Sequence, residues 1–190
     1  YAVLLPRDPH GHVDQAIGKN IAAGSVGLIA PNRLVSKDFE EITLDGVKMV
    51  FQNTPDTEAP VEMNTWFPQF KAMWMAENTT NTLHNVLTLR GALVRDSLRW
   101  AGFIDETIGL YGSRAEVKFQ SHHWPMWGNA RIVDYLKKQR DLYKYVHDQS
   151  VNLMNKGFTG TEIAEMLGIS SGTSKSQLHR VRMTLRRYLE

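Results

Sequence analysis

The sequence predicts an α/β fold, because stretches with the composition of buried strands alternate with longer stretches that have the periodicity of amphipathic helices. The strand candidates are 47–53, 72–78 and 116–121, and a polar loop follows each of them. Helical spacing of apolar side chains runs through 85–111 and 129–155. Polar residues therefore concentrate where strands end, a common place for functional side chains.

The first two strand candidates follow a stretch of mixed character that reaches to about residue 45. VKMVFQN (47–53) is rich in β-forming residues and is followed at once by the breaker TPDTEAP, which indicates a buried strand that leads into a loop. AMWMAEN (72–78) has the same character. Each of these two strands ends at a loop with a carboxylate, Glu58 in the first and Glu77 in the second.

The remaining elements continue the alternation. Residues 85–111 predict a helix with charged side chains between its apolar positions, and EVKFQS (116–121) predicts a third strand, which leads into the loop HHWPMWGN. Residues 129–155 predict a long amphipathic helix with four apolar side chains on one side, Ile132, Leu136, Tyr143 and Val146. Its length and its Lys and Arg content favour a helix that packs on the outside of the domain.

The composition limits the chemistry. The 190 residues suffice for one domain with a small appendage. The chain contains no Cys, which excludes thiol nucleophiles and Cys-based zinc sites and leaves metal binding to His, Asp and Glu. No apolar run approaches the roughly 18 residues of a membrane span, and no secretory signal opens the chain. Because the chain starts at Tyr1 without Met, we expect a fragment or a processed product.

Three side chains with the chemistry of metal ligands follow the predicted strands: Glu58, Glu77 and His122. Neighbouring strand ends can bring them together, and carboxylate and imidazole both suit zinc. The spacing alone leaves a second interpretation open, in which the carboxylates are solvated and the His packs against its neighbours.

A second metal candidate is PHGHVDQ (9–15), where His10, His12 and Asp14 are close enough in sequence to converge on a divalent ion. The residues themselves do not decide between a ligand loop and a solvent-facing loop.

Several longer runs resemble the alkylsulfatases of the metallo-β-lactamase superfamily: NTPDTEAPVEMNTWFPQ, AENTTNTLHNVLTLRGALVRD and SHHWPMWGN. The resemblance covers residues 1 to about 166. It implies the C-terminal half of a metallo-β-lactamase-like αββα sandwich over 1–128, followed over 129–156 by a long helix that starts a dimerisation region. The implied activity is hydrolysis of alkyl sulfate esters such as SDS to the alcohol and sulfate, with two zinc ions as cofactors.

The resemblance also implies roles for individual residues. The family takes zinc ligands from an HxHxDH run and from three later residues, which correspond to Glu58, Glu77 and His122. Asn85 and Arg90 resemble the residues that bind the sulfate ester, and a planar Arg fork suits a tetrahedral oxyanion. The alternative for Arg90 is a surface residue paired with a carboxylate.

The resemblance changes the interpretation of PHGHVDQ, because Gln15 stands where the HxHxDH run requires its last His. We therefore interpret His10 and His12 as solvent-facing. Three ligands of seven are too few to hold two ions, so we expect weak zinc binding and no activity from this chain alone. Glu62 is interpreted as solvated, and His84 has no predicted role beyond packing or solvent contact.

The stretch 157–190 resembles region 4 of extracytoplasmic-function sigma factors, where a helix-turn-helix places its second helix in the major groove of promoter DNA. Thr159 and Glu162 predict a capping box at the first helix, and Gly168 predicts the turn. From residue 157 onward the chain has five basic residues and three acidic ones, so this tail accounts for the whole net charge of +2. The candidate DNA-binding residues are Ser171, Thr173, Lys175, Ser176 and Arg180. The alternative is a basic amphipathic helix that packs on the preceding domain.

Three hypotheses result. The first is part of a zinc-dependent alkylsulfatase, and the second is a DNA-binding module in a chimeric chain, since the two resemblances meet within TEIAEML. The third is an inactive fragment that self-associates through 129–155 as a homodimer. Localisation follows the choice: exported or periplasmic for an alkylsulfatase, cytoplasmic if the tail functions.

Overall fold

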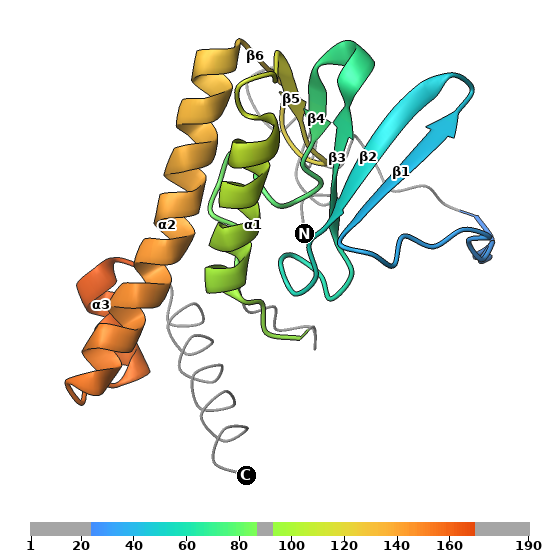
Figure 1. The fold of residues 1–190 in the computed structure, drawn as a ribbon. Coiled ribbons are helices and arrows are strands. Elements are labelled where there is room, and N and C mark those ends of the chain that lie inside the picture. The colour runs from blue at the N-terminus through green and yellow to red at the C-terminus, as the bar shows by residue number, and fades with distance from the viewer. Residues whose placement is uncertain (1–23, 87–92, 170–190) are drawn as a thin grey trace, which may run out of the picture.

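The computed structural model describes residues 24–86 and 93–169. In these ranges six strands form one mixed sheet, flanked by three α-helices and a short 3-10 turn (Figure 1). The strands are β1 (Phe39–Leu44), β2 (Val47–Asn53), β3 (Met63–Phe67), β4 (Ala72–Trp74), β5 (Val117–Phe119) and β6 (Met126–Trp127). The helical elements are η2 (Pro68–Phe70), α1 (Ser97–Tyr111), α2 (Asn129–Asn155) and α3 (Gly160–Leu167).

The strands follow one another across the sheet in chain order, and only the β4–β5 pair among them is parallel. A parallel pair needs a crossover connection, which α1 supplies between β4 and β5. Figure 1 shows α1 and α2 side by side next to the sheet, with α3 folded back against the far end of α2. The predicted α/β class is confirmed.

The three strand predictions are confirmed in position, and two of the three strands are shorter than predicted. The strand at 47–53 is β2, whereas β4 ends at Trp74 and β5 at Phe119 because the chain then turns into loops. Three strands were not predicted from the sequence: β1, an edge strand that pairs only with β2 in the described sheet, the central strand β3, and β6, which lies in the segment predicted as a loop.

The helix predicted for 85–111 begins only at Ser97. Asp96 has an extended backbone, and its side chain accepts hydrogen bonds from the N–H groups of Leu98 and Arg99, which makes it the N-cap of α1. Residues 93–96 are therefore not helical, so this part of the prediction was wrong.

Both later helices agree with the sequence. The helix α2 spans the predicted 129–155, and the four apolar residues of its predicted face are buried. In α3 the side chain of Thr159 and the side chain of Glu162 form the predicted capping box. Gly168 ends α3 in the left-handed conformation with φ 62°, which favours glycine. The division of the chain into domains stays a prediction.

The hydrophobic core lies between the sheet and the α1–α2 pair, and Trp100 of α1 is at its centre with no exposed surface. Its ring stacks on Tyr143 of α2 with 4.4 Å between centroids. Its indole N–H donates to the carbonyl of Asn78, in the loop after β4, at 2.8 Å. The same side chain therefore packs the core and holds a loop that carries candidate site residues.

A buried polar network joins the sheet to α1. Asn64 of β3 donates to the side chains of Gln52 and Thr107 at 3.1 Å each. Asn78 donates to the side-chain oxygen of Asn64 at 2.8 Å and to that of Thr54 at 3.0 Å. Because buried polar groups need partners, these contacts fix the start of the loops after β2 and β4 relative to each other.

A buried lysine lies under the loop after β4. Lys118 of β5 has no exposed surface, and its ammonium group donates to the carbonyl of Thr79 and lies 4.5 Å from the ring centre of Tyr135. The hydroxyl of Tyr135 donates to the same carbonyl at 3.2 Å. Burial lowers the pKa of Lys118 to about 7.

None of the helices within the described ranges has the length and apolar character needed to cross a membrane.

Candidate metal centre

The loop after β2 and the loop after β4 bring carboxylates together at one end of the sheet. Glu58, Glu62 and Glu77 each offer one oxygen, and these oxygens lie within 4.8 Å of one another. All three side chains are partly buried. Oxygens that bind one zinc ion at about 2.0–2.2 Å lie up to about 4 Å apart, so the cluster is close to the size of a metal site.

The third predicted ligand lies at the same place. The Nε2 atom of His122 is 3.5 Å from a carboxylate oxygen of Glu77. A backbone hydrogen bond of 3.0 Å from Ser121 to Ala76 joins the two loops just before these residues. The structure thus places Glu77 beside both Glu58 and His122, and the role of these three residues as metal ligands stays a prediction.

Glu62 is not the solvated side chain that the sequence analysis expected. Burial, together with the carboxylates of Glu77 and Glu58, raises its pKa to about 7, although the N–H of Met63 donates to it and acts in the opposite direction. The sequence signal was the four-residue spacing from Glu58 across Pro60, where a turn brings two carboxylates to one side.

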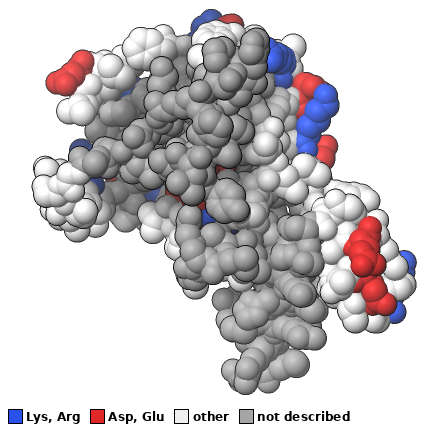
Figure 2. Space-filling view, turned by 180° about the vertical axis from the view of Figure 1, so that it is seen from behind, with Lys and Arg blue, Asp and Glu red and all other residues white. Residues whose placement is uncertain are grey.

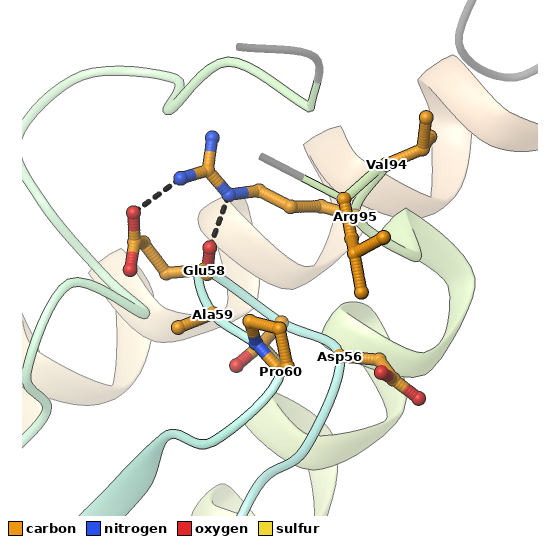
Figure 3. A pocket seen from close by; sticks show the side chains of 8 residues that line it. Asp56, Glu58, Ala59, Pro60, Val94 and Arg95 are labelled. Atoms are coloured by element: carbon orange, nitrogen blue, oxygen red, sulfur yellow. Dashed lines mark hydrogen bonds and ion pairs between the residues drawn. The ribbon is translucent and has the colours of Figure 1, made fainter. Parts of the chain in front are cut away.

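Arg95 is the site residue that the sequence analysis missed. Its guanidinium forms an ion pair with the carboxylate of Glu58 and donates to the carbonyl of the same residue (Figure 3). It also donates to the carbonyl of Asn85 at 2.9 Å and to its side-chain oxygen at 2.5 Å. A candidate metal ligand and a candidate sulfate binder are therefore held by one side chain.

His84 also belongs to this site. Its Nε2 atom lies 3.8 Å from a carboxylate oxygen of Glu58, and its ring is tilted over Trp100 with 5.9 Å between centroids. The expectation of packing or solvent contact alone was incomplete, because one face of the ring meets the core while a ring nitrogen approaches the carboxylate cluster.

The other predicted site residues lie outside the described ranges. These are the candidate sulfate-binding residue Arg90, and His10 and His12 near the start of the chain. The candidate DNA-binding residues also lie outside these ranges: Ser171, Thr173, Lys175, Ser176 and Arg180.

The chemistry of the cluster fits a divalent cation. Carboxylates repel one another when they are brought close together in a partly buried place, and a cation bound between them would offset this repulsion. The donor set of Glu58, Glu62, Glu77 and His122 offers oxygen atoms and one imidazole nitrogen, which are ligands that zinc takes.

Over most of its length the chain is similar to part of proteins named alkylsulfatases. It is 46% identical to the alkyl/aryl-sulfatase BDS1 of Saccharomyces cerevisiae over 171 residues, which are 90% of this chain and 26% of the relative. It is 45% identical to an (R)-specific secondary-alkylsulfatase of Pseudomonas sp. over 163 residues, 85% of this chain and 25% of the relative.

The fold agrees with this homology. The solved structure of the stereoselective inverting sec-alkylsulfatase Pisa1 from Pseudomonas sp. matches with a TM-score of 0.83 at 38% identity, over 94% of this chain and 31% of that one. The chain spans about a quarter of the length of the curated relatives it matches. Residues 153–185 match the family Sigma-70, region 4. Both resemblances predicted from the sequence are confirmed.

Proposed function

We propose that this chain supplies metal ligands and sulfate-binding side chains to a zinc-dependent alkylsulfatase, which hydrolyses alkyl sulfate esters such as SDS to the alcohol and sulfate. The observation that carries the proposal is the position of Glu77, which has a carboxylate oxygen within 4.8 Å of one of Glu58 and 3.5 Å from the imidazole of His122. Homology to proteins named alkylsulfatases supports the substrate class.

In this proposal the chain's own residues have separate tasks. Glu58, Glu77 and His122 hold the metal, and a bound zinc ion would neutralise the charge of the ester and activate a water molecule. Asn85 lies beside Glu58 through their shared partner Arg95, so its amide can donate to the sulfate group next to the metal. Arg90 is proposed as the second sulfate-binding group.

Two exposed tryptophans support an apolar substrate. Trp124, in the loop of His122, is 87% exposed, and Trp127, at the end of β6, is 61% exposed. Large exposed aromatic side chains next to a polar site are typical of a surface that binds an apolar group. We propose that they contact the alkyl chain of the ester.

The isolated chain is expected to turn over no alkyl sulfate. No HxHxDH run occurs within its 190 residues, so only part of the proposed ligand set is present. The measurement is release of sulfate from SDS in the presence of zinc, with a complete alkylsulfatase as the positive control. Turnover by the 190-residue chain would contradict the proposed division of ligands.

Zinc binding itself is testable on this chain by titration with zinc chloride, followed in ¹H–¹⁵N NMR spectra, which detect weak binding. Removing a ligand by Glu77→Gln is expected to weaken binding by at least about tenfold, since even the loss of a group behind a ligand often costs that much. Glu116→Gln is the matched control, because Glu116 is an exposed carboxylate paired with Lys71. Equal affinities for all three proteins would overturn the assignment of Glu77.

A second candidate function is DNA binding by the tail, which the match of residues 153–185 to Sigma-70, region 4 favours. Acidic side chains gather on the lobe around α3 in Figure 2, where Glu162 and Glu165 are exposed. Phosphates would be repelled there, so contact with DNA is proposed for the basic residues that follow, such as Lys175 and Arg180.

Salt dependence tests this function. We expect a gel-shift affinity for duplex DNA that falls steeply with salt, and we expect the double substitution Lys175→Ala and Arg180→Ala to reduce the slope of log affinity against log salt by about 2, one unit for each phosphate contact. Lys137→Ala and Lys138→Ala on α2 serve as the control pair. Binding that does not respond to salt, or no binding at low salt, would exclude the module.

A further inference from the structure

Arg95 joins the loop that carries Glu58 to the loop that carries Asn85. Its side chain is only 4% exposed, yet it carries a charge that must be satisfied within the protein. Contacts with two loops do so: the guanidinium donates to the carboxylate and the carbonyl of Glu58 (Figure 3). It also donates to the carbonyl and the side-chain oxygen of Asn85. One rigid guanidinium plane therefore fixes two loops relative to each other.

The backbone at Arg95 makes the same connection. Its N–H donates to the carbonyl of Val86 at 3.0 Å, and the next N–H, that of Asp96, donates to the carbonyl of Asp56 at 2.9 Å. Asp96 is also the N-cap of α1. The two loops are thus attached, by side chain and by backbone, to the rigid start of a helix.

The contacts leave Glu58 able to bind a metal. Both Arg95 and His84 approach its Oε1 atom, His84 at 3.8 Å. A carboxylate can bind an ion through one oxygen while a neighbouring residue holds the other, and such a neighbour orients the ligand and tunes its affinity.

Resting on the proposed function, we propose that Arg95 is a positioning residue, which holds the carboxylate of Glu58 in register with Glu77 and so sets the affinity of the site for zinc. The competing explanations make different predictions. If Arg95 served only as a counter-charge, its removal would tighten zinc binding, because a repelling cation would be lost. If it served only to stabilise the fold, its effect on zinc would not depend on Glu58.

The test is a zinc chloride titration of the full 190-residue chain by NMR, with Arg95→Gln, Glu58→Gln and the double variant. We expect Arg95→Gln to weaken zinc binding by about tenfold, the usual loss when a residue that orients a ligand is removed. In a chain that already carries Glu58→Gln, adding Arg95→Gln is expected to cause no further loss of zinc affinity. Arg99→Gln is the matched control, because exposed Arg99 pairs with Asp56 of the same loop at 2.6 Å.

Each other outcome decides the question. Unchanged or tighter binding by Arg95→Gln, or an equal loss in the Glu58→Gln background, overturns the positioning role and leaves the metal centre intact. No zinc binding by the unsubstituted chain overturns the proposed metal centre together with this role. Should Arg95→Gln not fold, Arg95→Lys decides: it keeps the charge but cannot span both loops, and binding equal to that of the unsubstituted chain overturns the role.

Discussion

Replacing Trp100 with alanine is expected to lower the free energy of unfolding by about 4 kcal/mol, the range seen for large buried aromatic residues. The substitution leaves a cavity against Tyr143, with which the indole ring stacks at 4.4 Å, and it removes the hydrogen bond to Asn78. Chemical denaturation followed by circular dichroism measures the effect. The loop after β4 is also expected to lose order, visible as faster amide exchange around Glu77.

Two further variants give this prediction its controls. Trp100→Phe keeps one aromatic ring against Tyr143 but loses the N–H donor and part of the buried indole volume, so a cost of about 2–3 kcal/mol is expected, less than that of Trp100→Ala. Trp124→Ala removes an indole that is 87% exposed, and a change within about 0.5 kcal/mol is expected there. If Trp100→Ala cost no more than Trp124→Ala, the described core would be incorrect.

The stability of the protein is expected to rise by about 2 kcal/mol between pH 7 and pH 9 because of Lys118. Burial lowers the pKa of this lysine from 10.5 to about 7 in the folded protein. Between these two values the unfolded chain keeps a proton that the folded chain has released, so raising the pH favours the folded state. Urea unfolding at a series of pH values measures the change.

Lys118→Met is expected to remove this dependence, because methionine occupies a similar volume and carries no titratable group. The window stops at pH 9 because burial raises the pKa of Tyr135 and of Tyr143, which acts in the opposite direction at higher pH. Lys138→Met, at an exposed position of α2, is the control. A rise in stability from pH 7 to pH 9 that persists in Lys118→Met would contradict the assignment of this rise to Lys118.

Much of the fold could be predicted from the sequence, because local patterns decide it. The strand at 47–53 and the helix at 129–155 were predicted with correct bounds from composition and periodicity alone. The start of α1 could not be, since the apolar spacing continues through 93–96 while the side chain of Asp96 caps the helix there. Capping is one local contact, and it outweighed the periodicity of the segment.

The candidate site residues that come directly after a strand could be predicted from the sequence, because the end of the strand fixes where they lie in the fold. Glu58, Glu77 and His122 each follow a strand, and strand ends of one sheet meet. Arg95 was not predictable, because one arginine among several in 85–111 gives no sign of burial. Its role depends on two loops, those of Glu58 and Asn85, that only the tertiary structure brings to it.

Anomalous diffraction at the zinc absorption edge, from zinc-soaked crystals of the chain, shows whether Glu58, Glu77 and His122 form part of a metal centre. We expect an anomalous peak within about 2.0–2.3 Å of the carboxylates of Glu58 and Glu77 and of the imidazole of His122. A peak at His10 and His12, with none beside Glu77, would contradict it.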